Sequence, residues 1–390
     1  MKTPFFVIDK KKLDDNILNF KVALEKIWPN SRLAYSVKTN SLPWLLKYLR
    51  TQDIMAEVVS DEEYDLAILC GYKRDEIVFN GPIKGEDTFL DSVRNKSIVN
   101  IDSKNDVEFF IKNIKESKEN IGVRVNLDTS LFNSNDIGYI EDGFRFGFAE
   151  ENDDLINVID ILRFNNKNNR IGFHFHCNSI TRSLDVYRKI AEYAKYIIEK
   201  YEVLPSFLDI GGGFFGGVEG KPTASEYIKV IYEVLKDTVD VDNTTLIVEP
   251  GSAIIGSAVD FHTSVIDTKD TSKSRIVTTD GSRINIDPLW SKNKYTNKII
   301  MMNDLDRDVM EKQIICGYTC MDHDRIMTLF NEKTFYKGDR IIYEKVGSYT
   351  MTFGGPFIRY FPEVYVKDGN KVELVRKRMD VKDYYKIQTI

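Results

Sequence analysis

Leu33-Ala-Tyr-Ser-Val-Lys38-Thr-Asn40 is a short apolar stretch that predicts a β-strand ending on a lysine. A lysine at the end of a buried strand either extends its ammonium group to solvent or takes part in chemistry. Four later strand ends carry polar or glycine-rich groups, namely Ser60, His176 with Ser179, Gly211 to Gly213, and Glu249. This series makes Lys38 a candidate for a Schiff base with a carbonyl cofactor.

Eight strand-like runs, most of them separated by amphipathic helical patterns, set the predicted fold. The runs are Arg32–Lys38, Ile54–Ser60, Glu76–Gly81, Ser97–Ile101, Ile121–Asp128, Arg170–Cys177, Phe207–Gly213 and Thr245–Gly251. Short strands rich in Val, Ile and Phe that alternate with helices over roughly 220 residues predict an α/β fold, a parallel (β/α)8 TIM barrel. Residues 129–150, rich in Gly and Asn, interrupt the alternation and are predicted to form an active-site loop.

After Gly251 the pattern changes to β-rich segments broken by Gly and Asp turns. We expect a C-terminal antiparallel β domain, onto which the N-terminal strand at residues 3–8 folds back. The predicted domains are a cofactor-binding barrel over residues 25–265 and a β domain made of residues 1–24 and 266–390.

Composition excludes several functional classes. The chain has 390 residues, 42% of them hydrophobic and 29% charged, so a large core and two domains are expected. Its net charge of −6, with Lys10 to Lys12 as the one basic run, argues against nucleic acid or anionic lipid as a partner. The apolar run before Asp9 is too short for a signal peptide, and no run reaches membrane-spanning length, so we expect a cytoplasmic protein with four free cysteines.

In a barrel of this type, side chains at the C-terminal ends of the strands converge on one mouth. That rule selects Lys38, Glu57, Ser60, Arg124, Asn126, His174, His176, Asp209, the triple glycine and Glu249. The Gly211–Gly213 loop follows a buried strand and has no side chains. Its backbone N–H groups can therefore bind an anion such as a phosphate. Glu249, at the end of an apolar strand, could keep a pyridine nitrogen protonated and so strengthen the ring as an electron sink.

His174 and His176 share one face of a strand, and an H-x-H pair could ligate a metal as in amidohydrolases. The other histidines, His262 and His323, lie outside the barrel run, and the sequence shows no Cys or carboxylate cluster for the missing ligands. We therefore expect no metal. One histidine is predicted to lie flat against a planar ring, and the other to be a hydrogen-bonded wall residue.

Taken in order, these segments resemble the fold-type III, alanine-racemase-like family of pyridoxal-phosphate (PLP) decarboxylases, which includes the diaminopimelate, ornithine, arginine and carboxynorspermidine decarboxylases. Tyr35-Ser-Val-Lys38 resembles the cofactor-lysine segment, and Phe175-His-Cys-Asn-Ser179 resembles the segment whose histidine stacks on the pyridine and whose serine touches the phosphate. The resemblance implies PLP as cofactor. The cofactor-binding candidates are Lys38, Glu57, Arg124, His176, Ser179, Gly211, Gly212, Gly213, Glu249, Gly251 and Tyr349.

Beyond the barrel, Cys316-Gly-Tyr-Thr-Cys320-Met-Asp-His-Asp324 resembles the cysteine loop that the family's β domain inserts into the partner subunit's site. Gly347-Ser-Tyr349 resembles the Gly-Ala-Tyr element whose tyrosine reaches the phosphate. The resemblance implies a homodimer with active sites at the interface. In it, Lys38 would be the catalytic lysine, and Cys320 would return a proton to Cα after CO2 is lost.

Three departures from the family pattern bear on the substrate. Ser252 stands where many relatives have Arg, and Met321 stands where diaminopimelate decarboxylases show Glu and ornithine decarboxylases Asp. Asp287-Pro-Leu-Trp290 replaces the Arg-Pro-x-Leu-Tyr segment that grips the distal carboxylate of diaminopimelate. The substrate-binding candidates are Asp287, Met321 and Asp324, and we rank ornithine-, lysine- or arginine-like amino acids above diaminopimelate, with a conjugate of such an amino acid as a further option.

Two further readings compete with decarboxylation. A racemase on the same fold would need a second base opposite Lys38 and would gain nothing from a carboxylate at the pyridine nitrogen. A catalytically silent, decarboxylase-like binding protein predicts the loss of Lys38 or Cys320, and both are present.

Overall fold

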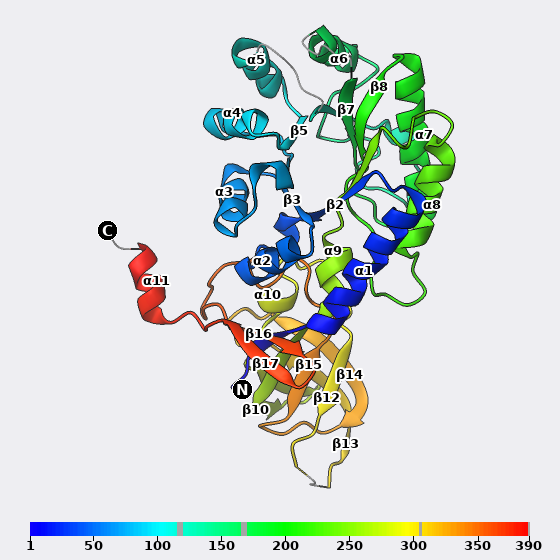
Figure 1. The fold of residues 1–390 in the computed structure, drawn as a ribbon. Coiled ribbons are helices and arrows are strands. Elements are labelled where there is room, and N and C mark those ends of the chain that lie inside the picture. Colours follow the sequence, from blue (N-terminus) through cyan, green and yellow to red (C-terminus); the bar gives the residue numbers. More distant parts are fainter. Residues whose placement is uncertain (115–119, 165–169, 304–305, 389–390) are drawn as a thin grey trace. The chain divides into compact units, whose positions relative to one another are not determined.

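A computed structural model describes residues 1–114, 120–164, 170–303 and 306–388 (Figure 1). The chain divides into two compact units. Residues 16–254 form the first, here called the barrel unit, and residues 1–15 with 255–390 form the second, the β unit. Both boundaries lie earlier in the chain than residues 25 and 265, where the sequence analysis placed them.

Within the described part of the barrel unit, eight parallel strands close into a barrel in sequence order. They are β2 (Ser31–Ser36), β3 (Met55–Val58), β4 (Ile77–Phe79), β5 (Ile98–Ile101), β6 (Ile121–Val125), β7 (Arg170–Phe175), β8 (Leu204–Asp209) and β9 (Thr245–Val248). Each strand falls within or overlaps one of the eight predicted runs, so the predicted barrel is confirmed.

Helices follow the strands and surround them, as Figure 1 shows. They are α1 (Lys10–Ile27), α2 (Pro43–Thr51), α3 (Asp61–Leu69), α4 (Glu86–Arg94), α5 (Lys104–Asn113), α6 (Asp154–Phe164), α7 (Leu184–Lys200), α8 (Ala224–Leu235) and the short α9 (Ser252–Ile255). Hydroxyl side chains cap four of them by accepting a hydrogen bond from the backbone N–H three residues on. Ser60 is one of these caps, since it accepts from the N–H of Glu63 at the start of α3.

The barrel interior has two layers that follow from the two-residue repeat of a strand. Ala34, Met55, Val78, Phe207 and Ile247, from five strands, pack together with Ile98 as an apolar layer. Gly172 on β7 makes room for this layer, because a Cβ there would overlap the ring of Phe207. Two residues further along the same strands, on the same face, stand Glu57, Asn80, Asn100, Asp209 and Glu249, which we call the polar layer.

The inserted loop at residues 129–150 starts with a turn of 3₁₀ helix at Thr129–Leu131 after β6. The Asn126 amide holds the far end of the loop, because its Nδ2 donates to the carbonyls of Phe144 at 2.6 Å and Phe146 at 2.8 Å. Ile137 forms a β-bridge with Ser179. The loop is therefore attached to the segments that follow β6 and β7, at the C-terminal ends of those strands.

In the β unit, the sheet contains β1 (Phe5–Asp9) between β10 and β16, so the predicted return of the N-terminal strand is confirmed. Its other described strands are β10 (Val259–Asp270), β11 (Arg275–Thr279), β12 (Asn297–Ile300), β13 (Val309–Cys316), β14 (Arg325–Lys333), β15 (Arg340–Tyr343), β16 (Glu363–Asp368) and β17 (Lys371–Arg376). Among the described residues, the short helices α10 (Arg283–Ile286) and α11 (Val381–Gln388) also lie in this unit.

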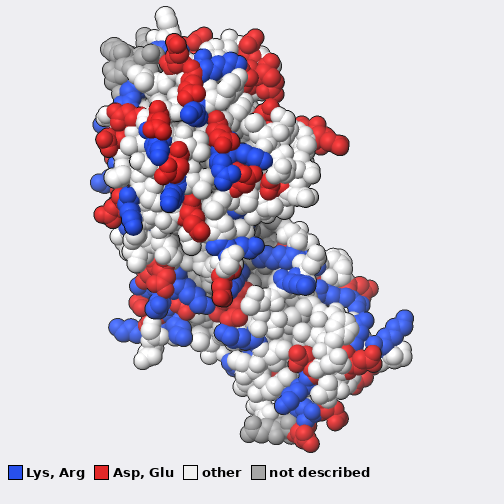
Figure 2. Space-filling view, turned by 90° about the vertical axis from the view of Figure 1, so that its right-hand side faces the viewer, with Lys and Arg blue, Asp and Glu red and all other residues white. Residues whose placement is uncertain are grey.

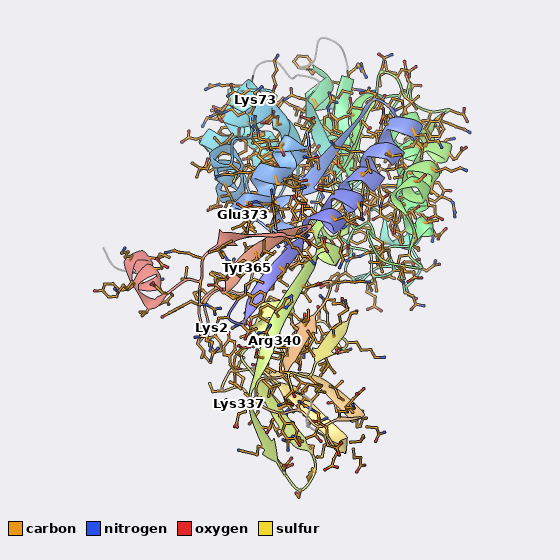
Figure 3. The ribbon with its side chains drawn as sticks, turned by 60° about the horizontal axis from the view of Figure 1, so that its bottom comes forward. Lys2, Lys73, Lys337, Arg340, Tyr365 and Glu373 are labelled. Atoms are coloured by element: carbon orange, nitrogen blue, oxygen red, sulfur yellow. The ribbon has the colours of Figure 1, made fainter. Side chains whose placement is uncertain are left out.

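The sheet of the β unit is mixed. We expected antiparallel pairing throughout, but β1 pairs in parallel with β16, and β11 with β13. β1 therefore has an antiparallel neighbour, β10, on one side and a parallel neighbour, β16, on the other. Figure 3 labels Tyr365 and Glu373, which lie on the antiparallel hairpin β16–β17.

Two observations bear on partners. Among the residues described, no helix combines the length and apolar character that crossing a membrane requires. On the face drawn in Figure 2, acidic and basic side chains are interspersed over the barrel unit.

Candidate active site

Lys38 lies two residues beyond the end of β2, in the 3₁₀ helix Val37–Thr39, instead of on the strand itself. Its Nζ is 2.8 Å from Oε2 of Glu57, whose side chain is 1% exposed, whereas the lysine side chain is 44% exposed. Ser36 Oγ donates to the same carboxylate oxygen at 2.6 Å. The amine is thus held by a buried anion while it remains open to a reagent from solvent.

Gly251 explains why the lysine turn and the Glu249 turn can lie so close. A Cβ at Gly251 would overlap the side-chain oxygen of Thr39, the last residue of the lysine turn. The structure therefore gives Gly251 a packing role, and its predicted contact with a cofactor stays a prediction.

Hydrogen bonds connect the polar layer across the barrel. Asn80 Nδ2 donates to Glu57 Oε1 at 3.2 Å and to Glu249 Oε1 at 2.7 Å. Asn100 Nδ2 donates to Asn80 Oδ1 at 2.8 Å and to Asp209 Oδ2 at 3.1 Å. A continuous path of contacts therefore runs from Lys38 through Glu57 to Glu249 and Asp209.

The electrostatics of this layer follow from burial. Burial raises the pKa of Asp209 to about 7. Burial first, and then the neighbouring carboxyls of Asp209 and Glu57, raise the pKa of Glu249 well above its usual range. The layer therefore retains a proton at neutral pH, because several carboxylates packed this closely cannot all ionise.

His176 provides a flat, neutral ring at the end of β7. Burial lowers its pKa to about 3, and the positive charges of Arg124 and Lys38 act in the same direction. Its ring packs against Gly211, where a Cβ would come within 2.6 Å of the imidazole. The predicted role as a surface for a planar cofactor is compatible with this neutral state.

The structure differs from the prediction for His174. It was predicted as a hydrogen-bonded wall residue, but it is 2% exposed and neither ring nitrogen has a hydrogen-bond partner among the described residues. Its ring lies nearly parallel to that of His176, with centroids 6.2 Å apart. Glu249 Oε2 is 3.9 Å from its Nε2, just beyond hydrogen-bond distance.

The same residues correct the argument against a metal. Ligand atoms of His174, Asp209 and Glu249 lie within 4.8 Å of one another, so carboxylates do accompany the histidine. The rule about strand ends already places Asp209 and Glu249 at the same mouth as His174, so these two carboxylates had to be counted as possible ligands. The number of available metal ligands therefore does not distinguish a metal-dependent hydrolase from a PLP-dependent enzyme.

The glycine loop keeps part of its backbone free. Gly211 and Gly213 have φ values of +65° and +88°, which glycine adopts without strain. The Gly211 N–H donates to Asp209 Oδ1 at 2.9 Å, and the N–H groups of Gly212 and Gly213 have no partner in the described part of the chain. Two donors thus remain for an anion.

Arg124 and Ser179 have partners within the barrel unit. Arg124 Nη1 is 3.0 Å from Asp102 Oδ2, and its guanidinium lies over the ring of Phe146. Ser179 Oγ donates to the carbonyl of Asp136 and accepts from the N–H of Arg182. The contacts of both side chains with the cofactor stay predictions.

The cysteine loop in the β unit is anchored by Asp324. Its buried carboxylate accepts from Ser282 Oγ at 2.9 Å, from the Arg283 N–H at 3.0 Å and from Thr319 Oγ1 at 2.7 Å. Cys320, one residue beyond Thr319, is exposed. Asp324, predicted to bind substrate, is therefore engaged in shaping the loop that presents the thiol.

Asp287 is also occupied internally. It is 3% exposed and pairs with Arg283, while accepting from Tyr295 Oη at 2.9 Å and from the N–H groups of Ser291 and Lys292. These donors fill the acceptor sites of a carboxylate, so a substrate cation would have to displace them. Met321 is half-buried beside Cys320, and Tyr349 is half-buried with φ +54°.

Asn80 and Asn100 were missed by the sequence analysis. Both obey the rule that selected the other residues, since each stands two residues beyond an inward apolar side chain, Val78 or Ile98. A buried asparagine at the end of a Val- and Ile-rich strand was the available signal.

Comparison with known proteins supplies the family. Residues 12–256 match the model of the pyridoxal-dependent decarboxylase family, pyridoxal binding domain. Over 398 residues the chain is 23% identical to a probable chloroplastic diaminopimelate decarboxylase of Oryza sativa subsp. japonica, covering 99% of this chain and 79% of that protein.

Solved structures show the same fold. The diaminopimelate decarboxylase of Helicobacter pylori, complexed with L-lysine, superposes with a TM-score of 0.80 at 21% identity, covering 100% of this chain and 97% of that one. The arginine decarboxylase of Paramecium bursaria Chlorella virus gives 0.77 at 20% identity, covering 94% and 96%. With the family match over residues 12–256, this chain belongs to the pyridoxal-dependent decarboxylases, and its reaction is the PLP-dependent decarboxylation of an amino acid.

Proposed function

We propose that this chain removes the α-carboxylate of a diamino acid at the mouth of its barrel, with Lys38 as the residue that carries PLP. The observation that supports this most directly is the contact of the Lys38 amine with Glu57 and, through Asn80, with Glu249. An accessible amine and a buried carboxyl thus belong to one hydrogen-bonded system.

The barrel unit offers a fitting group for each part of the cofactor. Lys38 would hold its carbonyl carbon, the neutral ring of His176 would cover its ring, and the free N–H groups of Gly212 and Gly213 would bind its phosphate. Glu249, whose pKa is raised, would face the ring nitrogen and exchange a proton with it. When bound, PLP supplies the electron sink that accepts the electron pair left by departing CO2.

We further propose a homodimer in which Cys320 of the partner subunit returns a proton to the substrate's Cα. The exposed thiol stands on a loop that Asp324 holds in one shape, which supports a role away from the core of its own β unit. Met321 would contact the substrate beside it. The internal bonds of Asp287 and Asp324 favour a supporting role for these carboxylates.

The substrate class is proposed from the relatives, whose names include diaminopimelate and arginine decarboxylases. Asp287 stands where diaminopimelate enzymes carry an arginine, so we propose a lysine-, ornithine- or arginine-like amino acid in preference to diaminopimelate. The four cysteines are free thiols, in keeping with the cytoplasmic location that we propose.

The first experiment tests Lys38. Purified protein is mixed with PLP and a panel of diamino acids, and absorbance of the bound cofactor and CO2 release are followed together. Lys38→Ala should lose the lysine-linked absorbance and nearly all CO2 release, whereas Lys229→Ala, at an exposed position on α8, should behave as the parent. CO2 release at the parent rate by Lys38→Ala would refute the proposal, and substrate epimerisation without CO2 would indicate a racemase.

The second experiment tests the shared site. Lys38→Ala and Cys320→Ala chains, each inactive alone, should recover up to about one quarter of parental activity when mixed, because random pairing gives half heterodimers with one complete site each. Cys316→Ala serves as the control thiol. No recovery after labelled subunits have been shown to exchange would contradict a thiol acting across the interface.

A further inference from the structure

Two asparagines bridge the carboxyl groups of the polar layer, and the proposed function uses Asn80 only as the link between Glu57 and Glu249. Asn80 and Asn100 are 2% and 1% exposed, so their amides lie in the barrel interior. Burying an amide is unfavourable unless it is hydrogen-bonded, and an apolar residue would fill the same place at lower cost. The role of these two asparagines therefore lies in the hydrogen bonds that their amides make.

The bonding pattern determines which way the Asn80 amide points. Asn100 donates to Asn80 Oδ1, so the Asn80 nitrogen must face Glu57 and Glu249. The reverse orientation would place the amide oxygen against two carboxyl oxygens and leave the Asn100 donor facing an NH2 group. The amide nitrogen of Asn80 thus donates one hydrogen to each of two carboxyl groups.

This pattern decides which oxygen of Glu249 can carry a proton. Oε1 accepts from Asn80, and this bond favours placing a proton of Glu249 on Oε2. The charged and titratable groups around Glu249 are Asp209 on β8, His174 on β7, Glu57 on β3 and Lys38 on the turn after β2. Asn80 is the neutral donor among them, and it contacts Glu57 as well.

We propose that Asn80 is a positioning residue that orients the Glu249 carboxyl, favours its ionised form and links it to the Lys38–Glu57 pair. Asn100 holds Asn80 in the orientation that this role needs. The inference rests on the proposed function, because it concerns how Glu249 holds a proton at the ring nitrogen of PLP.

The role makes a directional prediction. Asn80→Leu removes the donor that favours ionised Glu249, so Glu249 binds its own proton more tightly and holds a proton on the ring nitrogen less well. The pH midpoint of the absorbance change of bound PLP should then fall by about one unit, a tenfold change in proton affinity. The kcat of the loaded enzyme should fall by a larger factor than KM changes.

Asn80→Asp has nearly the same shape and separates this role from space filling. Its carboxyl can donate when protonated but repels Glu57 and Glu249 when ionised. Its absorbance and turnover, relative to the parent, should therefore be nearer normal at pH 6 than at pH 9. Asn80→Leu should show no such recovery on acidification.

The control is Asn16→Leu, which removes another buried amide of the barrel unit, one that donates to the carbonyl of Ile254. This variant should lose stability but keep the parental midpoint. If all three variants share that midpoint and the defect of Asn80→Asp does not depend on pH, Asn80 only fills space and the inference is wrong. If instead Lys38→Ala still binds and turns over as the parent does, the proposed function fails first, so the two failures are distinguishable.

Discussion

The two layers of the barrel interior stand on the same strands and follow opposite rules. Met55, Val78, Ile98, Phe207 and Ile247 bury hydrocarbon, whereas Glu57, Asn80, Asn100, Asp209 and Glu249, each two residues further on, bury amides and carboxyls. The first arrangement stabilises the fold through the hydrophobic effect. The second raises the pKa values of Asp209 and Glu249 and so costs stability, which is expected where groups are arranged for chemistry.

One barrel strand thus serves both purposes through its inward face. On each strand the apolar residue packs in the centre of the barrel. The polar residue two positions further on is held in place because its apolar neighbour is rigidly packed. Substitutions in the two layers should therefore separate folding from catalysis.

The largest effect on stability is expected in the apolar layer. Phe207→Ala empties the centre of this layer, where Gly122 and Gly172 offer no side chain to refill the space, and should lower the free energy of unfolding by about 3–5 kcal/mol. Urea unfolding of the cofactor-free protein measures this. Phe164→Ala, at a side chain 91% exposed, should change it by less than about 0.5 kcal/mol. Equal losses would show that the layer is not the core of the barrel.

A smaller effect is expected at the border between packing and binding. Gly211 and Gly220 both have positive φ, but a Cβ at Gly220 meets nothing within 4 Å, whereas one at Gly211 meets the His176 ring. Gly220→Ala should cost about 1 kcal/mol from backbone strain, and Gly211→Ala about 1–2 kcal/mol more. PLP titration should show affinity reduced about tenfold, roughly 1.4 kcal/mol, only for Gly211→Ala. Equal affinities would mean that the ring of His176 does not touch the cofactor.

The smallest change in stability is expected in the polar layer, together with a large loss of activity. Glu249→Gln retains an oxygen toward Asn80 and a donor toward Asp209, so at pH 6 the free energy of unfolding should change by less than about 1 kcal/mol. Decarboxylation should fall about 100-fold or more, because the amide cannot exchange a proton with the ring nitrogen. Glu192→Gln, on the exposed face of α7, serves as the control and should leave both quantities unchanged.

The pH dependence sharpens that prediction. Because the pKa of Glu249 is raised in the folded protein, its protonated form is favoured there, and stability is lost as pH rises toward the folded pKa. Glu249→Gln should therefore lose less stability than the parent between pH 6 and pH 9, measured by urea unfolding without PLP. A parallel loss in both proteins would contradict the raised pKa.

Much of the site could be predicted from the sequence, because each signal was local. Lys38 ends an apolar run, Gly211 to Gly213 follow a buried strand, and Glu249 closes another, so one rule about strand ends found them. Asn80 and Asn100 obeyed the same rule but carry no charge, and their significance depends on which carboxyls stand opposite. Asp287 misled for the complementary reason, since its partners Arg283 and Tyr295 become visible only when the turn is folded.

The sequence by itself determined the eight strands, the parallel barrel and part of the candidate site, because the alternation of strands with helices and the residue types at strand ends are properties of neighbouring residues. Only the tertiary structure decided how the polar layer is bonded, where the N-terminal strand pairs and which carboxylates are already satisfied. These depend on closure of the barrel and on sheet order, which bring together residues as distant in sequence as Asn80 and Glu249, or Phe5 and Glu363. No local sequence pattern predicts these long-range contacts.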